Sequence, residues 1–221
     1  ISPRYWKGFG QAISYISKKM NVFFLLMTAT QPHISNSKEL APPNTFFPYN
    51  RHEYKVLVNK KIKIDELADI LKENLTGYGK SGLIVMNRKK AALQAYRALE
   101  KLELQGPILL LSGWMTPLRR RIILRYLKWL EKKGRQRYLV STQVVEAGVD
   151  LDFDWVFRDL GPLDSIIQVA GRCNRHSRKD FIGKVLIAEL TDEKGHSLWR
   201  NVYDEILIEK TKEVLEEQPS F

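Results

Sequence analysis

Apolar positions at the start of the chain follow first a helical period and then a strand pattern. Residues at three- and four-residue steps predict a helix: Phe9, Ala12, Ile13, Ile16 and Met20. The wholly apolar run 22–27 then predicts a short buried strand. Four prolines between residues 32 and 48 predict a linker, with no regular structure beyond one turn of helix at 37–40.

From residue 54 onward, apolar runs of strand length alternate with longer helical patterns. We expect six strands, at 54–58, 83–86, 108–111, 138–141, 155–158 and 184–188. We expect helices from residue 65, at 89–104, from 117, at 164–172 and at 198–217. Strands separated by helices of this length imply parallel βαβ units. The predicted fold is therefore α/β, a RecA-like parallel sheet flanked by helices.

The helix that begins at Pro117 has clear end signals, because Thr116 can cap it, proline suits its first position and Gly134 suits the position past its end. One set of positions predicts its buried stripe: Leu118, Ile122, Tyr126 and Leu130. A second set carries cations and is expected to face solvent: Arg121, Arg125, Lys128 and Lys132.

The net charge of +11 is concentrated in one segment. Residues 87–137 hold 14 Lys and Arg against three Glu, so the rest of the chain is neutral. A solvated basic surface is one reading, and binding to a phosphate backbone is the favoured one. Three members of this segment are candidates for binding single-stranded nucleic acid: Trp114, which could stack on bases, with Arg121 and Arg125.

Composition excludes several classes of protein. No apolar run approaches the roughly 20 residues of a membrane helix, so we expect no membrane contact. Because Cys173 is the single cysteine, the chain has no internal disulfide, which fits a reducing cytoplasm. The four histidines show no metal-ligand spacing, so no metal site is expected. The first ten residues read as a cut made inside a larger protein.

The segment 141–175 contains the most specific chemistry. It reads STQVVEAGVDLDFDWVFRDLGPLDSIIQVAGRCNR and holds the pattern Q-x-x-G-R-x-x-R. On a helix, Arg172 and Arg175 would share one face and could point two guanidiniums at one anion. A triphosphate held by a partner domain needs such cations, because they stabilise charge that grows during phosphoryl transfer.

The same segment begins with a strand end and a turn. Thr142 follows the strand directly, so its hydroxyl and the neighbouring N–H groups could hold a nucleic-acid phosphate. Gly148 allows a close approach of the turn, and Asp150 could accept a hydrogen bond from a ribose hydroxyl. Ligands of open α/β sheets gather at the carboxyl ends of the strands, where we expect these candidates to lie.

These residues resemble superfamily 2 helicases, and more closely the helicase-nuclease family of type I CRISPR interference. The runs S-T-Q-V-V-E-A-G-V-D and A-G-R-C-N-R are similar to motifs V and VI, and R-D-L-G-P-L-D-S between them is similar to that family's distinctive element. Thr28-Ala29-Thr30 resembles motif III and Asn87-Arg88 resembles motif IV. The segment 110–114 lies where the family has its next nucleic-acid loop.

The resemblance implies a role for each matching residue. Thr142 and Ser112 would contact a single strand, with Asn87 and Arg88 nearby. ATP would be bound by Gly148, Asp150 and Gln168, with Arg172 and Arg175 as arginine fingers. Thr28 and Thr30 would couple hydrolysis to strand movement. The implied partners are single-stranded DNA, the CRISPR RNA-guided surveillance complex, and an HD nuclease domain or subunit.

The sequence lacks both motifs that build the other half of an ATP site. Neither G-x-x-x-x-G-K-[ST] nor D-E-x-[DH] occurs, so Mg²⁺ would be held mainly by a first motor domain absent from this chain. Residues 1–48 are then expected to be the tail of that domain and a linker, 49–192 the second RecA-like domain, and 193–221 a helix leading to a further module. This segment alone is predicted to be inactive.

Two other functions remain open from the sequence. The chain could belong to a general superfamily 2 helicase of DNA repair or of RNA. It could also be a standalone module that grips nucleic acid without ATP, although the arginine pair would then have no purpose.

Overall fold

The computed structural model describes residues 5–27, 34, 37–38, 51–75, 77–102, 104–146, 150–178 and 180–217. The chain divides into two compact units, Ile1–Pro48 and Tyr49–Phe221. Most of the predicted linker and the Thr28-Ala29-Thr30 run lie outside the described residues.

A six-stranded sheet forms the centre of the second unit. Its strands are β1 (His52–Lys63), β2 (Ser81–Val85), β3 (Ile108–Leu111), β4 (Arg137–Ser141), β5 (Trp155–Asp159) and β6 (Gly183–Thr191). The strand order is β1-β6-β5-β2-β4-β3, and every neighbouring pair is parallel. The predicted parallel sheet of six strands is confirmed, and all carboxyl ends lie along one edge.

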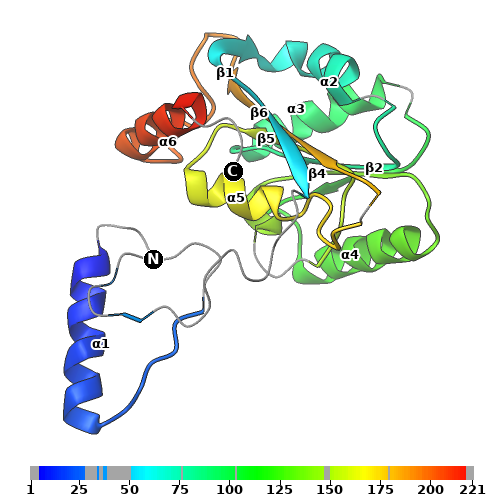
Figure 1. Ribbon diagram of the computed structural model, residues 1–221. Coiled ribbons are helices and arrows are strands. Elements are labelled where there is room, and N and C mark those ends of the chain that lie inside the picture. The colour runs from blue at the N-terminus through cyan, green and yellow to red at the C-terminus, as the bar shows by residue number, and fades with distance from the viewer. Residues whose placement is uncertain are drawn as a thin grey trace. The chain divides into compact units, whose positions relative to one another are not determined.

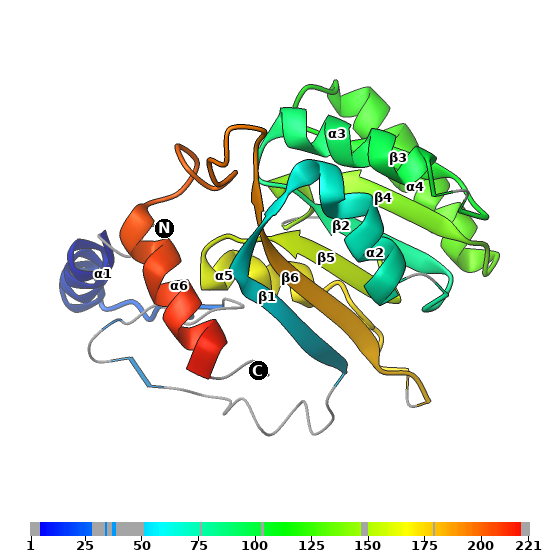
Figure 2. The same cartoon turned by 90° about the horizontal axis from the view of Figure 1, so that it is seen from above.

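Helices cover both faces of the sheet (Figures 1 and 2). One face carries the short 3₁₀ turn Ile64–Glu66 with α2 (Leu67–Leu75) and α3 (Lys89–Glu100), and the other carries α4 (Pro117–Lys132), α5 (Leu163–Ala170) and α6 (Glu205–Glu217). A second 3₁₀ turn, Gln143–Val145, follows β4. Buried apolar side chains fill both interfaces, because the central strands β2, β4 and β5 are buried at every position.

Three helix boundaries differ from the prediction. The helix from Lys89 ends at Glu100. The next correction matters for function, because α5 ends at Ala170 and the chain then turns, with the Arg172 N–H bonded to the Val169 carbonyl at 2.9 Å. The last helix begins at Glu205 rather than near 198, and its first turn is capped by Asp204, whose carboxylate accepts from the Ile206 N–H at 2.9 Å.

Helix α4 has the predicted ends but is turned differently about its axis. The Thr116 hydroxyl accepts from the Arg119 N–H at 3.4 Å, and Gly134 follows the helix with φ +60°. The predicted buried stripe is wrong, since Leu118, Ile122 and Tyr126 are exposed and Leu130 alone of that set is buried. The sheet contacts Leu127 and Leu130, with Ile123 and Leu124 partly buried beside them. The helix therefore has a second apolar face.

The described residues of the first unit include one helix, α1 (Trp6–Met20), which confirms the prediction. The predicted buried strand at 22–27 is wrong, because this run is exposed and forms no strand, with Phe23 99% exposed. A strand needs a neighbour that pairs with its N–H and C=O groups, and within the described residues none pairs with this run.

No helix among the described residues is long and apolar enough to cross a membrane.

Two leucines of α4 test which face supports the fold. Leu127 is 0% exposed and Leu118 is 66% exposed. We expect Leu127→Ala to lower the free energy of unfolding by about 2–5 kcal/mol, and Leu118→Ala to change it by less than about 0.5 kcal/mol. Urea unfolding followed by circular dichroism measures both. Equal losses of stability would mean that Leu118 is buried as well, as the sequence predicted.

Candidate nucleotide and nucleic-acid interface

The carboxyl edge of the sheet gathers several of the predicted nucleic-acid residues. Ser112 follows β3 and Thr142 follows β4, and both side chains are buried. The Ser112 hydroxyl accepts from the Trp114 N–H at 3.4 Å, and its carbonyl accepts from the Met115 N–H at 3.1 Å, which shapes the loop before α4. Trp114 is exposed in that loop, with the Lys89 ammonium 5.6 Å from its ring centroid.

Asn87 and Arg88 follow β2 at the same edge, but both are held by protein partners. The Asn87 amide donates to the Leu160 carbonyl at 2.6 Å and accepts from Arg158 at 2.7 Å. The Arg88 guanidinium donates to the carbonyls of Ser197 and Arg200, at 3.3 and 2.8 Å. These two residues therefore fasten the edge together, and their contact with nucleic acid stays a prediction.

The guanidinium of Arg158, at the end of β5, is fully buried and bonded to five groups. Its Nη1 donates to Asn87 Oδ1 at 2.7 Å and to the Asp159 carbonyl at 2.9 Å. Its Nη2 donates to Ser165 Oγ at 2.7 Å, Tyr203 Oη at 3.0 Å and Glu146 Oε1 at 3.4 Å. One cation thus joins β2, the turn after β4, the start of α5 and the segment before α6.

The surroundings of Arg158 explain two residues of the R-D-L-G-P-L-D-S run. A Cβ at Gly161 would lie 2.8 Å from the Arg158 Nη2, so a larger residue there would displace the buried guanidinium. Ser165 also donates to Glu146 Oε1 at 2.6 Å, which closes a triangle of hydrogen bonds with Arg158.

Burial perturbs the two carboxyl groups nearest this cation. Burial raises the pKa of Glu146 above its ordinary value, and the Ser165 hydroxyl and the Arg158 charge partly oppose that rise. Burial raises the pKa of Asp159 to about 7, opposed by Arg158 and by the N–H groups of Leu190 and Asn87. The carboxylates and the guanidinium therefore share one water-excluded network, where unpaired groups are costly.

The two candidate arginine fingers lie elsewhere. Since α5 ends at Ala170, neither Arg172 nor Arg175 lies on a helix, and the predicted same-face helical spacing is wrong. They also lie toward the amino ends of the strands, because the Arg172 carbonyl accepts from the N–H of Phe153, two residues before β5 begins. The expectation that all candidates share the carboxyl edge is therefore wrong as well.

The charges of the two guanidiniums nevertheless act on each other within this turn. The pKa of Arg172 is lowered first by burial and then by the charge of Arg175. The Arg172 Nη2 donates to the Glu146 carbonyl at 2.8 Å, whereas its buried Nε has no partner among the described residues. Two guanidiniums in one turn, one of them exposed, favour an anion at this turn.

Asp150 holds Arg175 from the other side. Its Oδ1 accepts from the Arg175 Nε at 3.1 Å, and its Oδ2 lies 3.6 Å from the Lys128 ammonium of α4. These contacts, the hydrogen bond from Arg175 first and the Lys128 charge second, lower the pKa of Asp150. The carboxylate expected to bind ribose is thus ionised, exposed and beside a candidate arginine finger.

The other predicted residues fall in three places. Gln168 is half-buried on α5, two residues before that helix ends. Arg121 and Arg125 are exposed on α4. Gly148, Thr28 and Thr30 lie outside the described residues, so their roles stay predictions.

One group among the described residues has ligand atoms close enough for a metal ion. Atoms of Glu131, Asp152 and His176 lie within 4.8 Å of one another, although the sequence predicted no metal site. Arg137 already supplies a positive charge there, 3.4 Å from Glu131 Oε1. Cys173, next to Arg172, is buried, and desolvation raises the pKa of its thiol. The thiol is therefore expected to be unreactive and to serve only in packing.

Sequence reasoning missed the residues that hold the site together. Arg158, Glu146 and Tyr203 were not candidates. A signal was present, because an arginine closing the apolar strand W-V-F-R must be paired when the strand is central.

The sequence is similar to that of known proteins. Residues 78–178 match a family model for the C-terminal part of the CRISPR-associated nuclease/helicase Cas3. That range runs from just before β2 through the turn with Arg172 and Arg175 and therefore includes both groups of residues. A Cas3 protein from Methanothermobacter thermautotrophicus is 30% identical over 163 residues, which are 72% of this chain and 19% of that protein. The chain carries a C-terminal helicase segment of the Cas3 family.

Solved Cas3 structures share its fold. The crystal structure of T. fusca Cas3-ATP superposes with a TM-score of 0.65 at 22% identity, over 78% of this chain and 22% of that one. A chain of a structure described as a CRISPR RNA-guided surveillance complex, pre-nicking, superposes with a TM-score of 0.58 at 22% identity, over 80% of this chain and 24% of that one. The chain thus spans less than a quarter of the length of these Cas3 relatives.

The Arg158 network should be the most sensitive polar feature of this Cas3-like unit. We expect Arg158→Met to lower the free energy of unfolding by about 3–5 kcal/mol, because it leaves the partners of the guanidinium unpaired in a buried site. Lys should rescue poorly, since one ammonium cannot replace the planar fork. Urea unfolding measures the loss.

Arg97→Ala is the matched control, because Arg97 is exposed on α3. A loss for Arg158→Met no larger than for this control would mean that the network contributes little to the fold.

Proposed function

We propose that this chain is the second motor domain of an ATP-dependent translocase that moves along and unwinds DNA in CRISPR interference. In this proposal Arg172 and Arg175 supply the arginine fingers, and the carboxyl edge of the sheet supplies part of the DNA-binding groove. The observation that carries the proposal is the paired guanidinium turn beside Asp150 in a Cas3-like fold.

The guanidinium turn fits a nucleotide. The exposed Arg175 offers donors to an anion, and Asp150 offers an acceptor for a ribose hydroxyl. The related T. fusca structure is described as bound to ATP. When bound, ATP would supply the phosphoryl group, and the arginines would stabilise the negative charge that develops on it. We expect Mg²⁺ to be held mainly by residues outside this chain.

The carboxyl edge fits a single strand of DNA. Ser112 and Thr142 end neighbouring strands there, and Trp114 is exposed next to Lys89. Hydroxyls and backbone N–H groups contact phosphates without regard to sequence, and an exposed tryptophan can stack on any base. The proposed contacts are Ser112, Trp114 and Thr142, with Asn87 and Arg88 nearby at the end of β2.

The proposed assembly follows from the family. One related chain lies in a structure described as a CRISPR RNA-guided surveillance complex, and the curated relatives are described as nuclease/helicases. We therefore propose that the protein carrying this chain works with such a complex and with an HD nuclease domain or subunit.

The arginine pair gives the decisive test. In the full-length protein, Arg175→Ala or Arg172→Ala should lower DNA-stimulated ATP hydrolysis by about a thousandfold or more. Lys should rescue poorly because it lacks the bidentate fork. Melting temperature and binding of a labelled single strand should stay nearly unchanged, because Arg175 is exposed, Arg172 is half-buried, and neither is among the proposed DNA contacts. If both variants keep near-normal turnover, the arginines are structural and the motor assignment fails.

This segment on its own should not hydrolyse ATP, since neither the phosphate-binding loop nor the acidic metal-binding motif is in its sequence. Phosphate release by the purified chain, with and without single-stranded DNA, checks this. Turnover clearly above a buffer blank would show that the chain builds a whole ATP site.

A further inference from the structure

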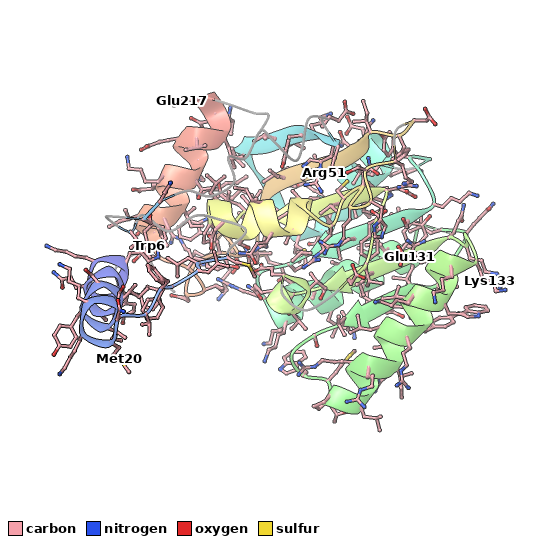
Figure 3. The ribbon with its side chains drawn as sticks, turned by 60° about the horizontal axis from the view of Figure 1, so that its bottom comes forward. Trp6, Met20, Arg51, Glu131, Lys133 and Glu217 are labelled. Carbon is pink, nitrogen blue, oxygen red and sulfur yellow. The ribbon has the colours of Figure 1, made fainter. Side chains whose placement is uncertain are left out.

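The outer face of α4 carries a continuous apolar stripe that no described residue covers. Leu118, Ile122, Tyr126 and Trp129 are 66, 57, 42 and 44% exposed. At 100° per residue they fall within an arc of about 80° and extend about 17 Å along the helix. Figure 3, in which Glu131 and Lys133 mark the end of α4, shows side chains standing out along this helix. Large contiguous apolar patches of this kind mark interaction sites.

A row of cations follows one flank of the stripe. Arg121, Arg125 and Lys132 are exposed, and none has an ion-pair partner among the described residues. Glu131, the one acidic residue of α4, turns inward, where its Oε1 lies 3.4 Å from the Arg137 guanidinium. Lys128, in the same row, pairs with the Asp150 carboxylate at 3.6 Å. The surface is therefore apolar along its middle and positive beside it, and the other three cations of the row lack a carboxylate partner among the described residues.

We propose that this face docks an amphipathic helix of a partner protein, with an apolar stripe and a row of Asp or Glu along one flank. Two helices pack by fitting the side chains of one stripe into those of the other, and the stripe on α4 has the length of about three helical turns. The carboxylates of the partner would pair with Arg121, Arg125 and Lys132 at the rim, which fixes orientation and favours this partner over others.

Two other occupants fit the face less well. Leu118 and Ile122 make up half of the stripe, and aliphatic side chains neither stack on bases nor bond to phosphates. The Tyr126 and Trp129 rings are stacked on each other, with centroids 5.9 Å apart, and the Arg135 guanidinium lies 5.2 Å from the Trp129 centroid. A second copy of the chain would set cations against cations. Under this proposal Arg121 and Arg125, which the sequence analysis expected to bind nucleic acid, contact a protein instead.

The test uses the full-length protein and two synthetic helices of about 18 residues. Both carry a Leu and Ile stripe, and one flank holds Glu in the first peptide and Lys in the second. We expect fluorescence anisotropy to show binding of the Glu peptide at least tenfold tighter than binding of the Lys peptide. Leu118→Ser with Ile122→Ser should weaken the Glu peptide by about tenfold or more, since each side chain loses its apolar burial.

Two further variants separate the parts of the proposal. Ile206→Ser, at a residue 68% exposed on α6, is the matched control and should leave binding unchanged. Arg121→Glu with Arg125→Glu should reverse the preference between the two peptides. Melting temperatures should stay within a few degrees of wild type because all these side chains are exposed.

A labelled oligo-dT strand distinguishes the nucleic-acid alternative. If the Leu118 and Ile122 variant binds the Glu peptide as well as wild type does, or if the full-length protein binds neither peptide, the proposal is overturned. It is also overturned if Arg121→Glu with Arg125→Glu abolishes oligo-dT binding while peptide binding shows no preference, because the row would then serve DNA. None of these outcomes depends on ATP hydrolysis, so the proposed motor function can stand or fall separately.

Discussion

The pairing of the buried Arg158 guanidinium is the interaction on which the site depends. A charge removed from water must find partners within the protein, and Arg158 finds them in four separate parts of the chain. The demand works in both directions, because Asn87, Glu146 and Ser165 are themselves largely buried and need its donors. The ends of the strands, the turn after β4 and the start of α5 are therefore held in one arrangement by a single planar cation.

Glu146 connects this network to the candidate nucleotide site. Its carboxylate accepts from Arg158 and Ser165, while its carbonyl accepts from Arg172. The carboxyl edge, where we propose that DNA binds, and the arginine turn, where we propose that ATP binds, thus meet in one residue. A shift of the turn after β4 would move both groups at once. Such a shared element gives a motor a physical means of relating strand position to the arginine fingers.

The sequence predicted the sheet well and the site only in part, because the strands are encoded locally whereas the site depends on contacts between distant segments. Strands β2, β4 and β5 were located because their apolar runs are buried on both faces, a demand that each run expresses locally. Arg172 and Arg175 were identified by spacing, but their place depends on where α5 ends. It ends at Ala170, whereas a shared helical face would need a helix that continues through Arg175. Arg158 was missed because its partners are brought together only by the fold.

Helix α4 shows that hydrophobic periodicity can reveal the apolar faces of a helix without showing which of them is buried. The helix has two apolar faces, one with Leu127 and Leu130 and one with Leu118 and Ile122, and a period of 3.6 residues fits both. The adjoining strands decide which face is buried, because β3 and β4 pack against the face that carries Leu127. A solvated helix has no need of the second face, so the apolar residues left there call for an explanation outside this unit. The cations beside them, Arg121, Arg125 and Lys132, restrict which partner can cover this face. Such a partner must bring both apolar surface and negative charge.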